Sequence, residues 1–436
     1  MSVAHTPSGS GDLARLRREL HQRLLATFDF SDADKATAGA LEGECRTRVE
    51  ALLDASGARL EAADRSRIVD GVLDDAFRLG PLEPLLADPD VTDVLVTGPD
   101  RVFVERHGQL QQSDARFRDT AHLMHVIQRV VRNAGRRIDE RSPMVDARLP
   151  DGSRVNAIIP PIAVDAPQLS IRRFPASALT LERLVELGTL PAETAELIRA
   201  AVRGRLNVIF SGGAGVGKTT VLNAASASIG SRERVITIED AAELRLLGEH
   251  VVRLETRAAN VEGVGALEPR DLVRNALRMR PDRIIVGECR GAEAFDMMQA
   301  MNTGHEGSMT TLHANSARDT LARLEMMLAM GGFDMPVRVI RDYVASAIHL
   351  VVHLARLPDG RRVMSEAIEV TGSGADGITV RTIHVLELHS RDEGAARGHF
   401  ASTGEQPSFL ARLRTRGVHV DPAIFRAGQL SGSWRP

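Results

Sequence analysis

The chain has 436 residues, of which 43% are hydrophobic and 26% charged, as in a folded protein of about two or three domains. A net charge of −3 excludes a general basic field for nucleic acid, and an aromatic content of 3% argues against platforms for base stacking. The two cysteines, Cys45 and Cys289, form neither a disulfide framework nor a zinc-binding spacing, and the longest apolar stretch, residues 344–354, is too short to cross a bilayer. We therefore expect a soluble cytoplasmic protein whose membrane role, if it has one, is peripheral.

The first part of the chain shows three helical patterns. Residues 1–11 are small and polar, lack the apolar core of a secretion signal, and are expected to be disordered. Beyond them, apolar residues recur at the spacing of one helix face. The three sets are Leu13, Leu16, Leu20, Leu24 and Phe28; Leu41, Cys45, Val49, Leu52 and Leu53; and Ile68, Val69, Val72, Leu73, Ala76 and Phe77. We predict a helical segment over residues 12–79, either a separate docking module or the outer part of the next domain.

Residues 80–175 predict an α+β domain. Strand patterns cover residues 91–96 and 102–105, with a turn between them. An amphipathic helix follows around residues 123–131, and further strand patterns cover 147–149, 154–159 and 168–174. The tight turn at residues 150–153 joins the first two of these strands.

Residues 176–436 alternate between strands and helices. A helical stretch at 192–202 leads into a strand at 207–210, a glycine-rich run, and a helix that begins at Lys218. Further strand patterns cover 235–238, 251–254, 284–286 and 309–312, with helical segments between several of them. The alternation indicates an α/β fold with a mostly parallel sheet covered on both faces. Hairpin-like strands at 349–354, 363–370 and 378–388, and a short helix near 408–413, form a C-terminal extension.

The glycine-rich run predicts a nucleotide site, because it fits G-x-x-x-x-G-K-T between a strand and a helix. Its glycines let successive backbone N–H groups point at phosphate oxygens, and the helix N-terminus adds a positive dipole. Lys218 is expected to reach the β- and γ-phosphates, and Thr219 to bind Mg²⁺. The predicted ATP-binding residues are Gly212, Gly213, Ala214, Gly215, Val216, Gly217, Lys218, Thr219 and Thr220.

Hydrolysis also needs a group that orients water, and two acidic strand ends are placed for this. Glu239 ends one apolar strand and Glu288 ends another, and parallel strands meet at their carboxyl ends. We predict that Glu288 activates water and that Glu239 positions Mg²⁺ through water. A strand-end carboxylate that forms a cap or salt bridge is the alternative for Glu288. Common P-loop enzymes have an aspartate directly after the strand, where this chain has Gly287, and Asp282 precedes the strand instead.

Two histidine segments follow, at residues 302–305 and 310–315. His313 ends an apolar strand, so it could hydrogen-bond the γ-phosphate and report whether ATP or ADP is bound. A lone histidine is more often a satisfied structural residue, and this alternative stays open on the residues alone.

The segments 212–220, 237–244 and 280–288 and the two histidine segments occur in the order found in type II/type IV secretion ATPases, and the chain resembles that superfamily. The ending Gly287-Glu288 is a mark of the superfamily. The runs 151–157, 170–174 and 250–257 look like those of CpaF/TadA-type motors of tight-adherence (Flp) pili. The resemblance is strong over residues 78–355. Cys289 departs from it, since an apolar residue is expected there.

The resemblance assigns further site residues. Its Asp-box carboxylates correspond to Glu239, Asp240 and Glu243, and its catalytic glutamate to Glu288. Its histidine box corresponds to His305 and His313.

Arginines of the N-terminal domain reach the phosphates in this family, and the matching positions are Arg154, Arg172 and, less closely, Arg173. A guanidinium that arrives on a mobile domain would neutralise charge in the transition state and couple domain closure to the nucleotide. Without the family, arginines on strands would be read as surface charges.

The resemblance also implies an assembly and a location. Such motors are homohexameric rings at the cytoplasmic face of the inner membrane, attached peripherally to platform proteins of a pilus or secretion machine. Each subunit has an N-terminal domain and a RecA-like ATPase domain. No direct nucleic-acid partner is expected.

Two side-chain groups have open interpretations. Arg270, Arg274 and Arg278 lie at helical spacing and form either a solvated face or a subunit interface. Six methionines are expected to fill the core or an interface: Met297, Met298, Met301, Met326, Met327 and Met330.

The leading hypothesis is a motor that couples ATP hydrolysis to assembly, or also retraction, of a Flp/Tad-type pilus or related secretion. A nucleotide-gated scaffold with negligible turnover is a second hypothesis, and the two acidic clusters argue against it. The third is the ATPase of a conjugation, DNA-transfer or protein secretion system. The near-neutral charge and few aromatics argue against direct DNA threading.

Overall fold

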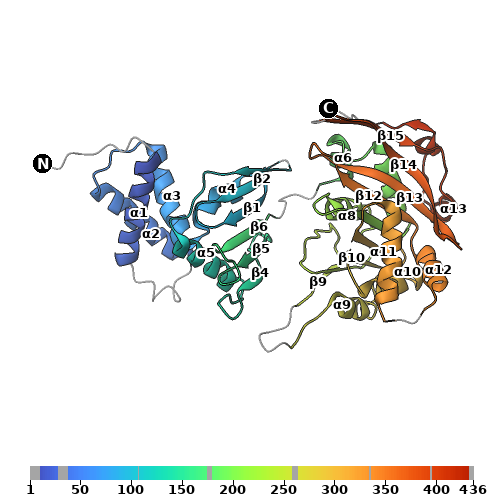
Figure 1. Ribbon diagram of the computed structural model, residues 1–436, viewed down its shortest axis with the longest axis horizontal. Helices are drawn as coiled ribbons and strands as arrows, with labels where there is room; N and C mark the ends of the chain where they lie inside the picture. The colour runs from blue at the N-terminus through green and yellow to red at the C-terminus, as the bar shows by residue number, and fades with distance from the viewer. Residues whose placement is uncertain are drawn as a thin grey trace. The chain divides into compact units, whose positions relative to one another are not determined.

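The computed structural model describes residues 10–27, 38–106, 108–173, 179–257, 264–332, 335–392 and 395–431. The chain divides into two compact units, Met1–Pro175 and Ala176–Pro436, which are described separately (Figure 1). Phe28, Phe174 and residues 1–9 lie outside the described residues. Residues 10 and 11, expected to be disordered, are instead the first turn of a helix, in agreement with the preference of serine for helix starts.

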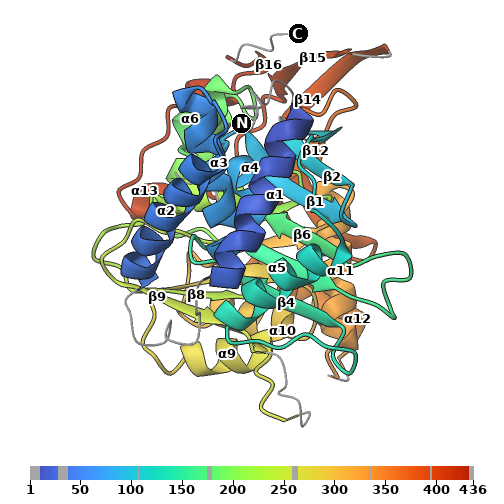
Figure 2. The same cartoon turned by 90° about the vertical axis from the view of Figure 1, so that its left-hand side faces the viewer.

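The first unit begins with α1 (Ser10–Thr27), α2 (Ala38–Ala55) and α3 (Ala62–Phe77), which Figure 2 shows from the side of α1. Their apolar faces meet in one cluster, in which Leu24, Val49 and Val72 are fully buried. η2 (Gly80–Leu82) and α4 (Glu83–Ala87) lead into the α+β part. Arg129, on a helix of that part, donates to the carbonyl oxygen of Asp75 over 3.2 Å. The helical segment therefore packs on the α+β part.

The α+β part is a six-stranded antiparallel sheet in the order β3-β2-β1-β6-β5-β4, covered by α5 (Thr120–Asn133). The strands are β1 (Val91–Thr97), β2 (Val102–Arg106), β3 (Gln109–Gln112), β4 (Met144–Arg148), β5 (Arg154–Ile158) and β6 (Gln168–Arg172). The sequence did not predict β3, because all four of its residues are exposed and show no alternation of apolar and polar side chains.

The second unit is built on a ten-stranded sheet, in the order β16-β15-β14-β13-β12-β7-β11-β10-β8-β9. Its parallel strands are β7 (Val208–Gly212), β8 (Val235–Glu239), β9 (Val251–Glu255), β10 (Arg283–Cys289), β11 (Met309–His313) and β12 (Leu350–Arg356). The antiparallel extension, orange to red in Figure 1, is β13 (Arg362–Gly374), β14 (Gly377–Asp392), β15 (Ala395–Ser402) and β16 (Gly428–Gln429).

Helices cover both faces of the parallel strands. Along β7, Val208 and Phe210 pack on one face and Ile209 on the other, as the alternation of a strand requires. The first face is covered by α6 (Leu181–Glu186), α7 (Ala192–Arg203) and α8 (Lys218–Ser226). The second is covered by α9 (Pro269–Ala276), α10 (Glu293–Asn302), α11 (Ala317–Met330) and α12 (Val337–Ala347). The predicted α/β class is confirmed. No helix in the described ranges is both long and apolar enough to span a membrane.

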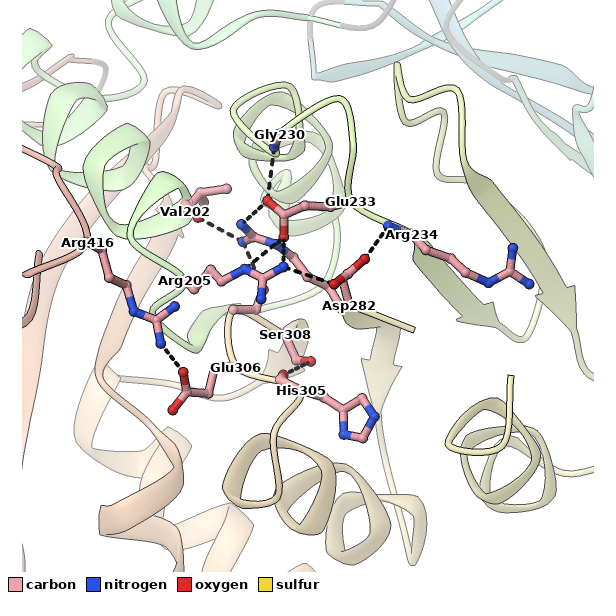
Figure 3. A network of polar contacts seen from close by, with 12 residues as sticks. Val202, Arg205, Gly230, Glu233, Arg234, Asp282, His305, Glu306, Ser308 and Arg416 are labelled. Atoms are coloured by element: carbon pink, nitrogen blue, oxygen red, sulfur yellow. Dashed lines mark hydrogen bonds and ion pairs between the residues drawn. The ribbon is translucent and has the colours of Figure 1, made fainter. Parts of the chain in front are cut away.

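An ion-pair network joins the amino ends of the parallel strands (Figure 3). Arg283, at the start of β10, is fully buried and forms two hydrogen bonds with Glu233, of 2.7 and 2.8 Å. Burial alone would raise the pKa of Glu233, but Arg283 and Arg205 outweigh it and bring the pKa to about 2. Asp282 accepts from the backbone N–H of Arg234 over 2.8 Å, so it belongs to this network.

The C-terminal extension is tied to the same end of the sheet. In α13 (Leu410–Thr415), Leu413 packs against Gly204 at the end of α7. Arg412 forms an ion pair of 2.8 Å with Glu306, which Arg416 also contacts. η3 (Pro422–Phe425) adds the buried Phe425 to the core.

Candidate nucleotide-binding site

The glycine-rich loop connects β7 to α8 at the carboxyl end of the sheet. A Cβ on Gly212 would overlap the carbonyl oxygen of Leu354 on the neighbouring β12, so only glycine fits there. Gly217, with a φ of 94°, turns the chain into the first turn of α8. Val216 is 4% exposed and anchors the loop in the core, whereas Ala214 lies at the surface. The loop thus presents backbone N–H groups at a helix N-terminus, which is a suitable arrangement for phosphate.

Lys218 lies at the centre of the site, with 7% of its surface exposed. Its Nζ donates to the carbonyl oxygens of Gly212 and Gly213 over 3.2 and 2.7 Å, and lies 3.4 Å from both ring nitrogens of His313. Burial lowers the pKa of Lys218, and nearby Glu288 opposes the shift. The amine is therefore held next to the loop, where it would contact a phosphate bound there.

Glu239 ends β8 and is 5% exposed. Its Oε2 accepts from the backbone N–H groups of Glu243 and Leu244 over 2.7 and 2.9 Å, while its buried Oε1 has no hydrogen-bond partner in the described part of the chain. Burial raises the pKa of Glu239 to about 7, against the effect of the two N–H groups. A buried acceptor without a partner fits a bound cation or its water.

Gly287 explains the departure from the usual acidic motif. A Cβ at this position would lie 2.9 Å from Cγ of Glu239. An aspartate here would displace the glutamate of the neighbouring strand, so the glycine makes room for Glu239.

Glu288 stands between two nitrogen-bearing side chains. Its Oε2 accepts from Nη2 of Arg290 over 2.8 Å, and its Oε1 lies 3.0 Å from Nε2 of His313, at ion-pair distance but outside hydrogen-bond geometry. Burial lowers the pKa of His313, which favours a neutral ring at neutral pH. The salt bridge expected in the alternative interpretation of Glu288 is present, yet the same carboxylate also faces His313 and Lys218.

Arg290 is a residue that the sequence analysis missed. Its Nη1 lies 3.5 Å from Oδ2 of Asp240, so one guanidinium joins Glu288 to Asp240. Its backbone N–H donates to Oε1 of Glu293, a buried residue at the start of α10. The only signal in the sequence that could have identified Arg290 was its position two residues after Glu288, the glutamate at the end of a strand.

The remaining predicted residues of this unit differ in burial and in their contacts. Thr219 and Thr220 lie half-buried in the first turn of α8, beside Lys218. Asp240 is exposed at the end of β8, and Glu243 is half-buried and contributes its backbone N–H to Glu239.

The prediction that His305 belongs to the nucleotide site is corrected, because the structure does not bring His305 to this site. It precedes β11, and the five residues of that strand carry the chain about 16 Å from the amino end of the sheet to His313. His305 lies with Ser308 and Glu306 at the opposite end (Figure 3).

The three predicted arginines lie in the first unit. Arg154 on β5 and Arg172 on β6 are register partners, so they share one face of the sheet, and Arg148 on β4 continues the row. Asp93 on β1 is the register partner of Arg172 on its other side, so the row also includes a carboxylate. Arg172 donates to Asp93 over 3.1 Å.

Arg173 differs from the other two. It donates to the carbonyl oxygen of Val91 over 2.9 Å and also contacts that of Asp88, so its guanidinium is fixed within its own unit.

The arginine row on α9 binds the neighbouring helix. Arg270 and Arg274 each donate to Asp296 of α10 over 2.9 Å, and Asp296 is 4% exposed. Arg270 and Arg274 are therefore more than a solvated face, whereas Arg278 follows α9 and is exposed.

Comparison with known proteins places the chain in a family. The family described as type II/IV secretion system protein matches residues 75–393. The chain belongs to this family of secretion ATPases. A protein of Mycobacterium tuberculosis named for conjugal transfer is 40% identical over 323 residues, which cover 73% of this chain and 91% of that protein. The conjugal transfer protein TrbB of Rhizobium radiobacter is 33% identical, with 66% of this chain and 86% of TrbB covered.

Two solved structures are also similar to parts of the chain. The VirB11 ATPase of the Brucella suis type IV secretion system is 30% identical, with 68% of this chain and 97% of that chain covered and a TM-score of 0.36. The pilus retraction motor PilT is 21% identical, with 67% and 82% covered and a TM-score of 0.49.

Proposed function

We propose that this secretion ATPase binds ATP with Mg²⁺ and hydrolyses it, and that hydrolysis drives a membrane machine. The observation that carries the proposal is the convergence of Lys218, Glu239, Glu288 and His313 from four elements on one glycine-rich loop. ATP supplies the phosphoanhydride bond that is broken. The loop N–H groups and Lys218 would hold its phosphates, and Thr219 and Glu239 would hold Mg²⁺ and its waters.

The other side chains have distinct proposed roles. Glu288 orients the attacking water and accepts its proton, for which the carboxylate must turn away from Arg290. His313, with a neutral ring beside Lys218, contacts the terminal phosphate and responds to its loss. Arg154 and Arg172, register partners on β5 and β6, are proposed to supply positive charge to an anion.

Two variants test hydrolysis. Lys218→Ala is expected to abolish turnover, because the loop loses its phosphate ligand. Glu288→Gln is expected to bind ATP normally and to release phosphate about 10²–10⁴-fold more slowly, the usual contribution of a general base. Phosphate release and equilibrium binding of a fluorescent ATP analogue, measured on the same preparations, separate the two effects. Normal turnover by the Glu288→Gln protein would refute the assignment.

We also propose that the machine is a Flp/Tad-type pilus assembled at the inner membrane, and that the motor is a homohexameric ring bound peripherally to platform proteins. The runs 151–157, 170–174 and 250–257 support this choice. Sizing the purified protein with ATP and with a slowly hydrolysed analogue tests the ring. A monomer that never hydrolyses ATP would favour a nucleotide-gated scaffold.

Conjugal DNA transfer is a second candidate, supported by the names of the Mycobacterium and Rhizobium relatives. It predicts an ATPase rate that rises with added DNA and loses that rise as salt is increased. The pilus proposal predicts no such response.

A further inference from the structure

A cavity of about 280 Å³ is lined in part by Arg290, the residue that donates to Glu288. We call it the Met–Arg notch and define it by four residues, Arg290 between β10 and α10 and Arg323, Met326 and Met330 on α11. Nothing in the proposed hydrolysis uses the last three of these residues. The notch nevertheless shares Arg290 with the catalytic carboxylate.

The notch combines exposed apolar surface with positive charge. Met297, Met298, Met301 and Met327 fill the core as expected, but Met326 and Met330 are 52% and 77% exposed. Methionine is unbranched and adaptable, and exposed methionines are common on surfaces that bind varied peptides. Leaving such side chains in water is unfavourable by about 25 cal/mol per Å², so burying them would favour a partner.

The charged part of the notch lacks a full set of partners. Nε of Arg323 is shielded from solvent and has no hydrogen-bond partner within the described ranges. Burial is the main cause that lowers the pKa of His313, and the charges of Arg290 and Arg323 add to it, so both arginines act on the nucleotide site. A carboxylate in the notch would satisfy Arg323 and also reach Arg290.

We propose that the Met–Arg notch binds an acidic–aliphatic peptide segment of a partner protein, whose carboxylate competes with Glu288 for Arg290. Arg290 holds Glu288 at 2.8 Å and Asp240 at 3.5 Å. Its backbone is fixed by Glu293, so only the side chain has to turn. A partner that draws the guanidinium toward the notch frees Glu288 to orient water, and the partner thereby speeds turnover. The coupling to turnover rests on the function proposed above, whereas the binding does not.

The composition of the notch favours a peptide over a nucleic acid. Two arginines offer few contacts to a phosphate backbone, and DNA would leave both methionines in water. An aliphatic side chain beside a carboxylate matches both halves of the notch.

The binding test uses the fluorescein-labelled peptide Gly-Ser-Glu-Leu-Glu-Leu-Glu-Ser-Gly, measured by anisotropy on the full chain. Replacing its glutamates by glutamine, or its leucines by serine, is expected to weaken binding about tenfold. The Met326→Ser/Met330→Ser protein and the Arg323→Gln protein should each lose a similar factor. Matched controls are Arg318→Gln, an exposed arginine on the same helix, and Met144→Ser, an exposed methionine of the first unit.

The coupling test measures phosphate release with saturating peptide. We expect about a threefold increase for the wild-type protein and for Met144→Ser, and no response from Arg290→Gln. A response retained in Arg290→Gln overturns the competition for this guanidinium. If the wild-type protein binds the peptide but does not hydrolyse ATP, the proposed function fails and the binding site stands.

Other outcomes overturn the notch itself. Equal binding by the Met326→Ser/Met330→Ser protein and the wild type places the peptide elsewhere. Displacement of the peptide by a duplex DNA oligonucleotide assigns the arginines to phosphate. A smaller sedimentation coefficient of the methionine variant, with loss of self-association, assigns the notch to a contact between copies of this chain.

Discussion

Each end of the parallel strands in the second unit holds a glutamate largely shielded from water, but only one of the two carboxylates has hydrogen-bond partners for both oxygens. At the amino end, both carboxylate oxygens of Glu233 accept hydrogen bonds, from Gly230, Arg205 and Arg283 (Figure 3). At the carboxyl end, Oε1 of Glu239 is buried and has no hydrogen-bond partner among the described residues.

The difference separates a structural network from a ligand site. A buried polar atom without a partner costs about 1–3 kcal/mol, so folding alone does not favour it. The carboxyl end retains Glu239 in this state beside Lys218 and a loop of backbone N–H groups, where a cation and phosphates would complete the set. At the amino end, the Glu233 carboxylate has hydrogen-bond partners for both oxygens without a ligand. Variants at the two ends should therefore fail in different ways.

The largest expected effect is on folding, at the amino end. Arg283→Met leaves Glu233 without its main partner, and breaking a buried ion pair costs about 3–5 kcal/mol. Urea unfolding of the variant should show this loss in the free energy of unfolding. Arg23→Met, which breaks an exposed pair with Glu19 on α1, is the control and should cost less than about 1 kcal/mol. Equal losses in the two variants would contradict the distinction.

The same network predicts acid sensitivity. The pKa of Glu233 is lowered in the folded state to about 2 from its ordinary value of 4.5, so its contribution to stability is complete above about pH 4.5. It is lost as the pH falls from there toward 2, by up to about 3 kcal/mol in all. Unfolding free energies measured across this range should fall steeply for the wild-type protein. The fall should be shallower for Glu233→Gln, which is less stable throughout.

At the carboxyl end, Mg²⁺ binding should depend on pH. Burial raises the pKa of Glu239 to about 7, and a metal ligand must be deprotonated. The affinity for Mg²⁺ with ADP should therefore fall as the pH drops below about 7, by up to about tenfold per unit. Titration calorimetry at about pH 6 and about pH 8 measures the change. Glu239→Gln, titrated in the same buffers, reports the contribution of the nucleotide itself, and an equal pH dependence in both proteins would exclude Glu239.

The sequence predicted most of this architecture because its signals are local. The helix faces around Leu24, Val49 and Val72, and the glycine-rich loop before Lys218, follow from spacing and from the conformational demands of a tight turn. The strands β3 and β16 gave no such signal, since they are short and their residues are exposed.

The site could be predicted only in part, because several of its contacts join residues far apart in sequence. Glu239 and Gly287 lie on neighbouring strands, so the reason for the glycine appears only in the fold. Arg290 belongs to no motif used in the sequence analysis, and only its position two residues after Glu288 distinguished it from a surface arginine. His305 was assigned to the site with His313 because both match the histidine box of the family, although a strand separates them.

The two histidines provide the finest test of the comparison, because they flank the same strand. His313 lies 3.4 Å from Nζ of Lys218 and is expected to contact the terminal phosphate, whereas His305 lies with the amino-end network. His313→Ala should reduce the preference for ATP over ADP by about threefold to tenfold, since one hydrogen bond is removed. His305→Ala should leave that preference unchanged within about twofold. Competition between the two nucleotides for a fluorescent analogue measures both. A larger effect from His305→Ala than from His313→Ala would contradict the assignment of nucleotide recognition to the carboxyl end of the sheet.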